Sequence, residues 1–239
     1  MKIALIGYGK MGHAIERVAT QRGHEIVERI DVNNTDAFND AAFKSADVAI
    51  EFTTPQTAVN NIRRAWQIGK PVVSGTTGWN AQFPELQREL RQNGHTLFWS
   101  SNFSIGVNLF MAINRRMAEL MNAMPQYDVQ IQEIHHIHKK DAPSGTAITL
   151  AEDIIQRLDR KTAWVLSNNV KADQISIEAL REGEIPGTHT VTYTSSTDSI
   201  TMTHAAKNRD GFALGAVLAA EFILGKQGFF GMNDMLHIN

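Results

Sequence analysis

Cysteine is absent from this chain of 239 residues, and its charges almost cancel, which leaves a formal net charge of -2. A chain without cysteine has neither a disulfide scaffold nor a thiolate nucleophile. The balanced charge gives no basic surface for nucleic acid or for an anionic membrane. No apolar run approaches the ~18 residues of a membrane-spanning helix, and we find no low-complexity tract or internal repeat. We therefore expect a globular protein of one large or two smaller domains, with neither nucleic acid nor membrane as partner.

The N-terminal residues carry the pattern of a dinucleotide-binding βαβ unit. The apolar run Ile3–Ile6 is typical of a strand buried on both faces, and it leads into the glycine-rich turn Gly7-Tyr8-Gly9-Lys10-Met11-Gly12. A helical stripe and a second strand-like segment follow, and that segment ends at Asp31, at about the 20-residue distance that the fingerprint requires. In this fingerprint the glycines permit a tight turn, a close approach of pyrophosphate and helix packing, while the acid binds the ribose. The turn and Asp31 are therefore predicted to bind a dinucleotide.

Alternating strands and helices continue from there to Phe103, which predicts an open parallel sheet. Two strand-like segments end in small polar loops, Gly75-Thr76-Thr77-Gly78 and Ser100-Ser101-Asn102-Phe103. Ligands of such sheets lie beyond the carboxyl ends of the strands, so we expect both loops to border the cofactor. Either loop taken alone would more often be an ordinary turn.

The pattern changes after Phe103. A long helical stretch near residues 105–124 and strand-like segments near residues 174–181, 189–195 and 199–203 predict an α+β domain with an antiparallel or mixed sheet. The stretch 211–224 is apolar nearly all round, which predicts a buried helix that returns to the first domain. We therefore expect a Rossmann-type, doubly wound parallel sheet in residues 1–103 and 210–239, and a substrate-binding and catalytic domain in residues 104–209.

The segment Glu133–Ala147 begins with three histidines and a lysine. Alternating apolar and polar residues predict a half-buried strand that leads into it. If the strand continues through the segment, His135 and Lys139 share one face while His136 and His138 share the other. Three histidines so close together suit zinc, but His135 then faces away from the other two, and no HExxH spacing occurs. We therefore predict no metal site.

The same segment ends at the start of a helix. Ser144 precedes apolar residues at helical spacing and is predicted to be the N-cap. Backbone N–H groups of Gly145 and Thr146 then lie at the positive end of the helix, which suits a carboxylate or a phosphate. A polar strand end with a routine helix cap is the plainer interpretation. The combination with the histidines predicts a small dianion held beside a proton donor.

These motifs together resemble one family over the whole chain. The run His135-His-x-His-Lys-x-Asp-Ala-Pro-Ser-Gly-Thr-Ala147, with the glycine turn and the loops after the strands, is similar to 4-hydroxy-tetrahydrodipicolinate reductase, also called dihydrodipicolinate reductase. The segment Asp141–Ala147 is highly specific, whereas many dehydrogenases share the glycine fingerprint. The resemblance implies an enzyme that reduces 4-hydroxy-tetrahydrodipicolinate with NADH or NADPH and loss of water, in the diaminopimelate route to lysine. It also implies a homotetramer, and, because the chain opens on a strand and not on a charged leader, we expect a cytoplasmic protein.

The resemblance also implies roles for single residues. It makes His135 and Lys139 the proton donors and His136 a substrate contact, with Ser144, Gly145 and Thr146 as the site of a substrate carboxylate. The cofactor residues that it implies are the pyrophosphate turn Gly7 to Gly12, the ribose acid Asp31, and Gly75, Thr76, Thr77, Ser100, Ser101, Asn102 and Phe103 around the nicotinamide. Arg209 is implied in contacts between the domains.

Two departures from the family pattern concern the cofactor. Lys10 stands where arginine is frequent, and Val32 follows Asp31 where NADPH-tolerant members carry arginine. Asp31 should bind the ribose hydroxyls and repel a 2′-phosphate, so we predict that NADH is preferred over NADPH, or that the two are at most weakly discriminated. The nearby Lys10 would blunt this preference.

Two other classes of function share part of the pattern. A dehydrogenase of another small imine or amino dicarboxylate, such as aspartate dehydrogenase, would share the cofactor half. A semialdehyde dehydrogenase needs a nucleophilic cysteine, which the chain lacks. A non-catalytic NAD-sensing module would have no use for His135, Lys139 and an anion site together.

Overall fold

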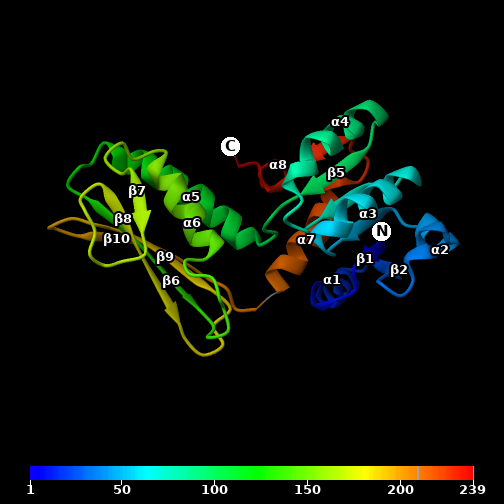
Figure 1. Ribbon diagram of the computed structural model, residues 1–239, viewed down its shortest axis with the longest axis horizontal. Helices are drawn as coiled ribbons and strands as arrows, with labels where there is room; N and C mark the ends of the chain where they lie inside the picture. Colours follow the sequence, from blue (N-terminus) through cyan, green and yellow to red (C-terminus); the bar gives the residue numbers. More distant parts are fainter. Residues whose placement is uncertain (209, 239) are drawn as a thin grey trace. The chain divides into compact units, whose positions relative to one another are not determined.

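The computed structural model describes residues 1–208 and 210–238 and divides the chain into two compact units (Figure 1). Unit 1 comprises Met1–Ile105 and Asp210–Asn239, and unit 2 comprises Gly106–Arg209. The chain therefore leaves unit 1 once and returns to it. The expected contact of Arg209 lies outside the described residues.

Unit 1 is built on a six-stranded sheet in which every neighbouring pair of strands is parallel. Its strands are β1 (Lys2–Ile6), β2 (Glu25–Ile30), β3 (Val48–Glu51), β4 (Val72–Ser74), β5 (Thr96–Trp99) and β11 (Gly228–Phe230). They follow the order β11-β5-β4-β3-β1-β2, so the direction of winding reverses around β1, which lies between β2 and β3. Open sheets bind ligands at such a reversal, outside the carboxyl ends of the strands. The predicted doubly wound fold is confirmed.

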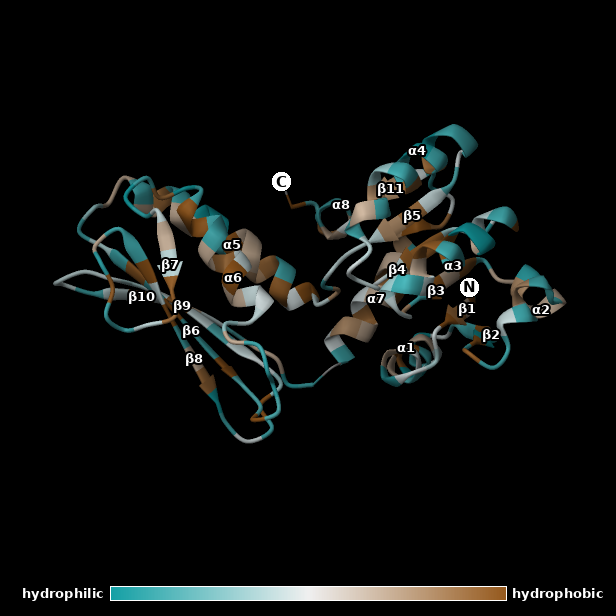
Figure 2. Cartoon of the chain, in the orientation of Figure 1, coloured by the Kyte–Doolittle hydropathy of each residue, from teal (hydrophilic) through white to brown (hydrophobic). Residues whose placement is uncertain are grey.

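Helices cover both faces of this sheet. Its helical elements are α1 (Lys10–Gln21), η1 (Thr35–Asn39), α2 (Ala41–Lys44), α3 (Pro55–Gln67), η2 (Asn80–Gln82), α4 (Phe83–Asn93), α7 (Asp210–Ile223) and α8 (Met232–Leu236). Ala4 and Ile6 of β1 pack with α3 and α4, whereas Ile3 and Leu5 pack with α1 and α7. Because successive residues of a strand point to opposite faces, both faces of β1 are buried, as the apolar run Ile3–Ile6 predicts. The strands of unit 1 accordingly show hydrophobic colour between helices with hydrophilic outer sides (Figure 2).

Helix α7 is buried within unit 1, among elements that come much earlier in the chain (Figure 1). Its fully buried residues are Ala213, Ala216, Val217, Ala219, Ala220 and Ile223. Gly215 faces the backbone of Phe103, where a Cβ atom would collide with the carbonyl oxygen. Small residues therefore let this helix lie close to the sheet, and the expected buried helix is confirmed.

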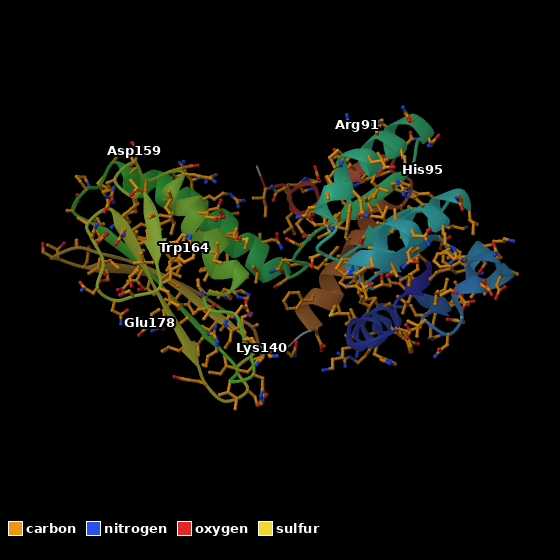
Figure 3. All side chains as sticks on the ribbon, in the orientation of Figure 1. Arg91, His95, Lys140, Asp159, Trp164 and Glu178 are labelled. Carbon is orange, nitrogen blue, oxygen red and sulfur yellow. The ribbon has the colours of Figure 1, made fainter. Side chains whose placement is uncertain are left out.

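Unit 2 has a five-stranded mixed sheet in the order β10-β9-β6-β8-β7. Its elements are α5 (Ile105–Asn122), β6 (Asp128–His135), α6 (Gly145–Ile155), β7 (Ala163–Val165), β8 (Gln174–Arg181), β9 (Thr188–Thr194) and β10 (Ser199–Ala205). Strands β10, β9 and β6 pair antiparallel, and β6, β8 and β7 pair parallel. Buried side chains of α5 and α6 pack on one face of the sheet. On a polar stretch of β6 and β8, Gln132 donates to Glu178 at 2.6 Å (Glu178 is labelled in Figure 3).

The predicted strand through the histidine segment is too long. Strand β6 ends at His135, opposite Arg181, which is the last residue of β8. Beyond that pair the chain turns, and the N–H of Lys139 donates to the carbonyl of His136 at 3.1 Å. Strand β8 ends at Arg181, and β9 begins at Thr188, opposite Ile134, so neither of these neighbours extends the ladder and the alternation ends. The condition under which His135 and Lys139 would share a strand face, with His136 and His138 opposite, is therefore not met.

Candidate active site

The glycine-rich turn of unit 1 gives each glycine a separate task. Gly7 has φ +92°, and a Cβ atom there would collide with the carbonyl oxygen of Phe52. A Cβ atom on Gly12 would come within 2.5 Å of the carbonyl oxygen of Gly7. Around Gly9, by contrast, no described atom lies within 4 Å of such a Cβ position. Gly7 and Gly12 therefore serve the packing of the turn, whereas Gly9 keeps an open approach to the N-terminus of α1, as an incoming pyrophosphate requires.

A cleft of about 380 Å³ opens beside this turn. It is lined by Gly9, Lys10, Met11, Phe52, Thr53, Pro55, Gly75, Thr76 and Thr77. The structure thus brings the start of α1 together with the loop after β4. The loop at Ser100–Phe103 does not line this cleft. Its Ser100 N–H donates to the carbonyl of Ser74 at 3.4 Å, and the Phe103 side chain is buried in the core, so Phe103 offers only its backbone to a ligand.

A buried carboxylate that the sequence analysis missed organises the cleft wall. Glu51, at the end of β3, is fully buried. It accepts hydrogen bonds from the hydroxyl groups of Ser74 at 2.5 Å, Thr76 at 2.8 Å and Thr53. Burial raises the pKa of Glu51, and these hydrogen bonds oppose the shift. The only sequence signal for this role is an acid at the end of an apolar strand.

The acid predicted to bind ribose follows β2 directly. Asp31 is exposed, and its carboxylate accepts from the N–H of Val32 at 2.9 Å. Close to it in sequence, Arg29 is held by Glu16 of α1, which also accepts from the hydroxyl of Tyr8. The hydrogen bond from Arg29 lowers the pKa of Glu16 to about 2. Tyr8 and Arg29 are therefore engaged with Glu16, which leaves Asp31 as the exposed charge at the end of β2.

The predicted anion site in unit 2 is the N-terminus of α6. Ser144 is the N-cap, and its side chain accepts from the N–H of Ala147 at 3.2 Å, as predicted. Gly145 is exposed, and Thr146 is partly buried in the same turn. The Ser144 backbone N–H donates to the carboxylate of Glu133 at 3.1 Å. The start of the helix is thus tied to the strand that carries His135.

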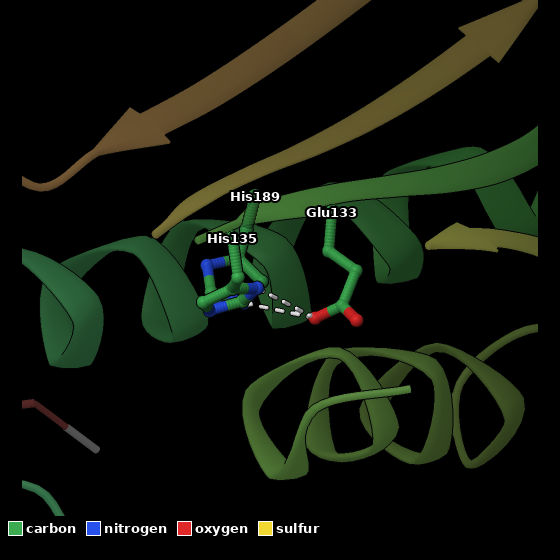
Figure 4. Close-up of side chains that lie close together, drawn as sticks. All are labelled: Glu133, His135 and His189. Atoms are coloured by element: carbon green, nitrogen blue, oxygen red, sulfur yellow. Dashed lines mark ion pairs between the residues drawn. The ribbon is translucent and has the colours of Figure 1, made fainter. Parts of the chain in front are cut away.

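Three buried side chains meet beside that helix end (Figure 4). Oε2 of Glu133 lies 3.3 Å from Nδ1 of His135 and 3.7 Å from Nε2 of His189. Glu133 is fully buried, and its other oxygen accepts from Arg181 at 3.1 Å. Nε2 of His189 lies 3.1 Å from the hydroxyl of Ser144. The ligand atoms of Glu133, His135 and His189 all lie within 4.8 Å of one another, so this trio could hold a metal ion, a possibility that the sequence analysis did not consider.

Burial controls the titration of both histidines. It lowers the pKa of His135, against the attraction of Glu133 and with further lowering from Lys139 and Arg181. It lowers the pKa of His189 to about 4, with the neighbouring His135 acting in the same direction. Both imidazoles are therefore mostly neutral near pH 7, and an added negative charge nearby would favour protonation of His135.

The remaining residues of the motif lie on the turn after β6. Nζ of Lys139 donates to both carboxylate oxygens of Asp141 at 2.8 Å, and this hydrogen bond lowers the pKa of Asp141. His136 is partly buried, and its ring centre lies 6.0 Å from that of His138. His138 is exposed and lies 3.2 Å from Glu184. His138 is therefore a surface residue, whereas Lys139 contributes to the charge around His135.

A parallel sheet of the dinucleotide-binding type, joined to a unit that sets buried histidines beside a helix N-terminus, is an arrangement that suits an enzyme of the oxidoreductase class. Residues 1–103 match the family model described as dihydrodipicolinate reductase, N-terminus, and residues 106–236 match the model of its C-terminus. The chain therefore belongs to the dihydrodipicolinate reductase family. This confirms the family resemblance drawn from the sequence.

Individual relatives agree with this assignment. The 4-hydroxy-tetrahydrodipicolinate reductase of Christiangramia forsetii is 46% identical over 238 residues, which cover 99% of this chain and 98% of the relative. That of Archaeoglobus fulgidus is 35% identical over 262 residues, covering 99% and 100%. The solved structure of dipicolinate-bound dihydrodipicolinate reductase from Paenisporosarcina sp. TG-14 has a TM-score of 0.78 at 21% identity, covering 97% of both chains. At that identity the solved structure supports the fold alone.

The fold is also found in other dehydrogenases. Aspartate semialdehyde dehydrogenase II from Vibrio cholerae has a TM-score of 0.55 at 11% identity, covering 94% of this chain and 98% of that one. Its chemistry does not follow for a chain without cysteine. Among the described residues, no helix is both long and apolar enough to span a membrane.

Proposed function

We propose that this chain reduces 4-hydroxy-tetrahydrodipicolinate to tetrahydrodipicolinate, with loss of water, in the diaminopimelate route to lysine. The observation that carries the proposal is the buried His135 of unit 2, set beside the N-terminus of α6 in a chain that matches both family models. The curated relatives that match over nearly the whole chain bear the name of this activity. Reductase chemistry thus rests on the family, and the roles of single residues rest on the geometry that follows.

The cofactor of this proposal is NADH or NADPH, held by unit 1. The residues fit such a cofactor because the approach at Gly9 is open and the N-terminus of α1 carries no side-chain cap. Gly7 to Gly12 would hold the pyrophosphate and Asp31 the ribose, while Gly75, Thr76 and Thr77 would border the nicotinamide. When bound, the cofactor supplies the hydride. Glu51 would keep Thr76 in place through the hydrogen bond at 2.8 Å.

The substrate of this proposal is a small dicarboxylate, held by unit 2. The Ser144 hydroxyl and the first N–H groups of α6, from Gly145 and Thr146, would bind one carboxylate. His136 would contact the substrate from the turn after β6. A dianion here would also stabilise a protonated His135, since it adds negative charge where burial and two cations disfavour the proton. Binding would thereby charge the proton donor.

The proton chemistry is assigned to His135 and Lys139. Hydride delivery to the ring builds negative charge toward the imine nitrogen, which a proton donor or cation stabilises. His135 would donate the proton. Lys139 would stabilise the carboxylate and the developing charge, after exchanging Asp141 for the substrate as its partner. The proposal also includes a preference for NADH, a homotetramer and a cytoplasmic location.

The test is to follow the absorbance of NADH in the presence of protein and enzymatically made 4-hydroxy-tetrahydrodipicolinate. We expect oxidation of NADH that depends on both. His138→Gln should retain the rate, because His138 is exposed and paired with Glu184. Oxidation with oxaloacetate and ammonia, but not with the cyclic substrate, would instead identify an aspartate dehydrogenase and overturn the proposal.

A further inference from the structure

We propose that Glu133 and Gly187 are positioning residues for His135. Glu133 holds the proton on Nδ1 of the imidazole, and Gly187 leaves Nε2 uncovered as the nitrogen that gives its proton to the substrate. This inference deepens the proposed function, because it rests on the role of His135 as proton donor. It adds two residues, one in β6 and one directly before β9, to which the motif itself assigns no role.

The two oxygens of Glu133 have different surroundings. Oε1 accepts from Arg181 and from the Ser144 backbone N–H, each at 3.1 Å. Oε2 has no hydrogen-bond partner among the described residues, and it faces Nδ1 of His135 at 3.3 Å. One oxygen is therefore fixed to the scaffold, and the other is left for the imidazole.

The facing nitrogen of His135 is likewise without a hydrogen-bond partner among the described residues. A carboxylate oxygen only accepts, so the pair is satisfied when Nδ1 carries the proton. The separation of 3.3 Å lacks the alignment of a hydrogen bond. Catalytic hydrogen bonds are often long without substrate and tighten in the complex. Protonation of the ring would therefore strengthen the contact with Glu133.

His189 does not compete for the same oxygen. Nε2 of His189 lies 3.1 Å from the Ser144 hydroxyl, and either atom of this pair can be the donor. In both tautomers Nε2 is engaged with Ser144, whereas it lies farther, at 3.7 Å, from Glu133. The pKa of about 4 keeps this imidazole neutral at the pH of the reaction. Oε2 of Glu133 is left to His135.

Gly187 lies on the other side of the His135 ring. It is buried with φ +153°, and its carbonyl accepts from the N–H of Ala206 at 2.9 Å, which anchors the segment. A Cβ atom on Gly187 would lie 2.9 Å from Nε2 and 3.2 Å from Cδ2 of His135. Any side chain at position 187 would thus press on the nitrogen that must meet the substrate.

The charges around His135 favour a proton-holding role for Glu133 over a metal site. Glu133 and Asp141 attract a proton to His135, whereas Lys139 and Arg181 repel it, and His189 is neutral. A dication bound by Glu133, His135 and His189 would lie close to Arg181, which is 3.1 Å from the second oxygen of Glu133. Removal of the Glu133 charge leaves two cations and one anion around the ring, so His135 should then titrate at a lower pH.

The test is ¹⁵N NMR of the histidine rings in the full chain, with His135→Gln to assign the signals and His138→Gln as control. In the unsubstituted protein we expect neutral His135 with its proton on Nδ1. In Glu133→Gln the tautomer preference should weaken and the titration should move to lower pH, and Glu133→Asp should recover part of both. A proton on Nε2 in the unsubstituted protein, or an unchanged titration in Glu133→Gln, would overturn the inference, as would zinc binding that shifts both histidines at micromolar concentration.

Kinetics separate this inference from the proposed function. Glu133→Gln should lower kcat by roughly 10², the scale of general-acid effects, and shift the pH profile while the affinity for NADH stays unchanged. If Glu133→Gln fails to fold, Gly187→Ala tests the second half, and it should lower kcat while His135 keeps its proton on Nδ1. Full turnover in Gly187→Ala overturns the role of Gly187. Full turnover in His135→Gln would instead refute the proton donor, whatever the NMR shows.

Discussion

His135 and Lys139 differ in how each can help hydride transfer. His135→Gln and Lys139→Ala should each lower the rate by roughly 10² or more, because each removes a proton donor or a cation from the developing charge. Steady-state kinetics measure the rate, and a fluorescence titration should show unchanged NADH binding, since both residues belong to unit 2. The double variant should lose little more than the worse single one if the pair acts as a unit.

The same kinetics can reassign either residue. Lys139→Ala with a raised KM and a normal kcat would make Lys139 a binding residue. Its Nζ already binds a carboxylate in the structure, that of Asp141, and could bind a substrate carboxylate in the same way. Wild-type turnover at saturating substrate in either single variant would remove that residue from the mechanism.

His189 makes the stability of unit 2 depend on pH. Its pKa is about 4 in the folded protein and ~6.5 in an unfolded chain, so the unfolded state binds more protons between these values. Stability should therefore fall as the pH drops from ~6.5 to ~4, by up to about 3 kcal/mol from this group, and burial of His135 acts in the same direction. Urea unfolding at several pH values, followed through NMR signals of β9, measures the effect.

The control for that effect is His189→Asn, which should be less stable at pH 7 yet show a flatter dependence below ~6.5. His138→Gln should keep the wild-type slope, because His138 is exposed. An unchanged slope in His189→Asn would contradict the assignment.

Local spacing was enough to predict some site residues and not others. Ser144 was predicted as an N-cap from the helical spacing that follows it, and Gly9 as part of the glycine fingerprint, and the structure places each directly before a helix. Glu133, Arg181 and His189 come together only because β6 pairs with β8 on one side and β9 on the other. Pairing of distant strands leaves no mark on a single sequence. The one local signal for this cluster is the position of Glu133. It occupies a buried position in the alternation of buried and less buried residues along β6, which ends at His135.

At the scale of the element, the residue that follows strand β2 leads us to predict the choice of cofactor. Asp31 should repel the 2′-phosphate of NADPH, and the nearest cation of β2, Arg29, is bound by Glu16. We expect NADH to be preferred, and Asp31→Asn to reduce that preference. Steady-state kinetics with both cofactors measure it, with Lys10→Ala to show whether Lys10 assists NADPH. A tenfold or larger preference for NADPH in the unsubstituted protein would contradict the role of Asp31.

The turn between β1 and α1 allows a matched pair of substitutions. Gly9→Ala adds a methyl group where no described atom lies within 4 Å, so the protein should fold normally and bind NADH roughly tenfold more weakly. Gly12→Ala presses on the carbonyl of Gly7 and should destabilise unit 1 by about 1–3 kcal/mol. Thermal unfolding and NADH titration distinguish the two. Normal NADH affinity in Gly9→Ala would place the pyrophosphate elsewhere.

Elements were predicted well where their periodic pattern was long. Strand β8 was expected at its observed bounds, and helix α7 within one residue at each end. Strands β7 and β11 have three residues each, too few to show alternation, and they escaped prediction. The end of β6 was overestimated because its own residues could continue as a strand. The observed end of β6 coincides with the end of its partner β8 at Arg181. Because Arg181 is distant in the sequence, the residues around His135 could not reveal where β6 ends.

At the scale of the whole molecule, each ligand should act first on its own unit. NADH should slow hydrogen exchange at the turn Gly7 to Gly12 and at the loop after β4, and pyridine-2,6-dicarboxylate should slow it at residues 144–147. Ligand at 100 times its Kd stabilises the protein that binds it by about 2.7 kcal/mol, which is ample for detection. Mass spectrometry of exchanged peptides measures both. Protection by the dicarboxylate confined to unit 1 would contradict the assignment of the anion site.

The return of the chain into unit 1 has a consequence for biosynthesis. Helix α7 fills one side of the nucleotide-binding core, and β11 completes its sheet, yet both are translated after the whole of unit 2. Domains tend to fold as they emerge from the ribosome. Unit 2 can therefore fold while the first 105 residues still lack a layer of their core, which exposes apolar strand faces to chaperones. Chains that end near residue 209, arrested on the ribosome through a linker that spans the exit tunnel, should show protease-resistant unit 2 beside a cleavable N-terminal segment.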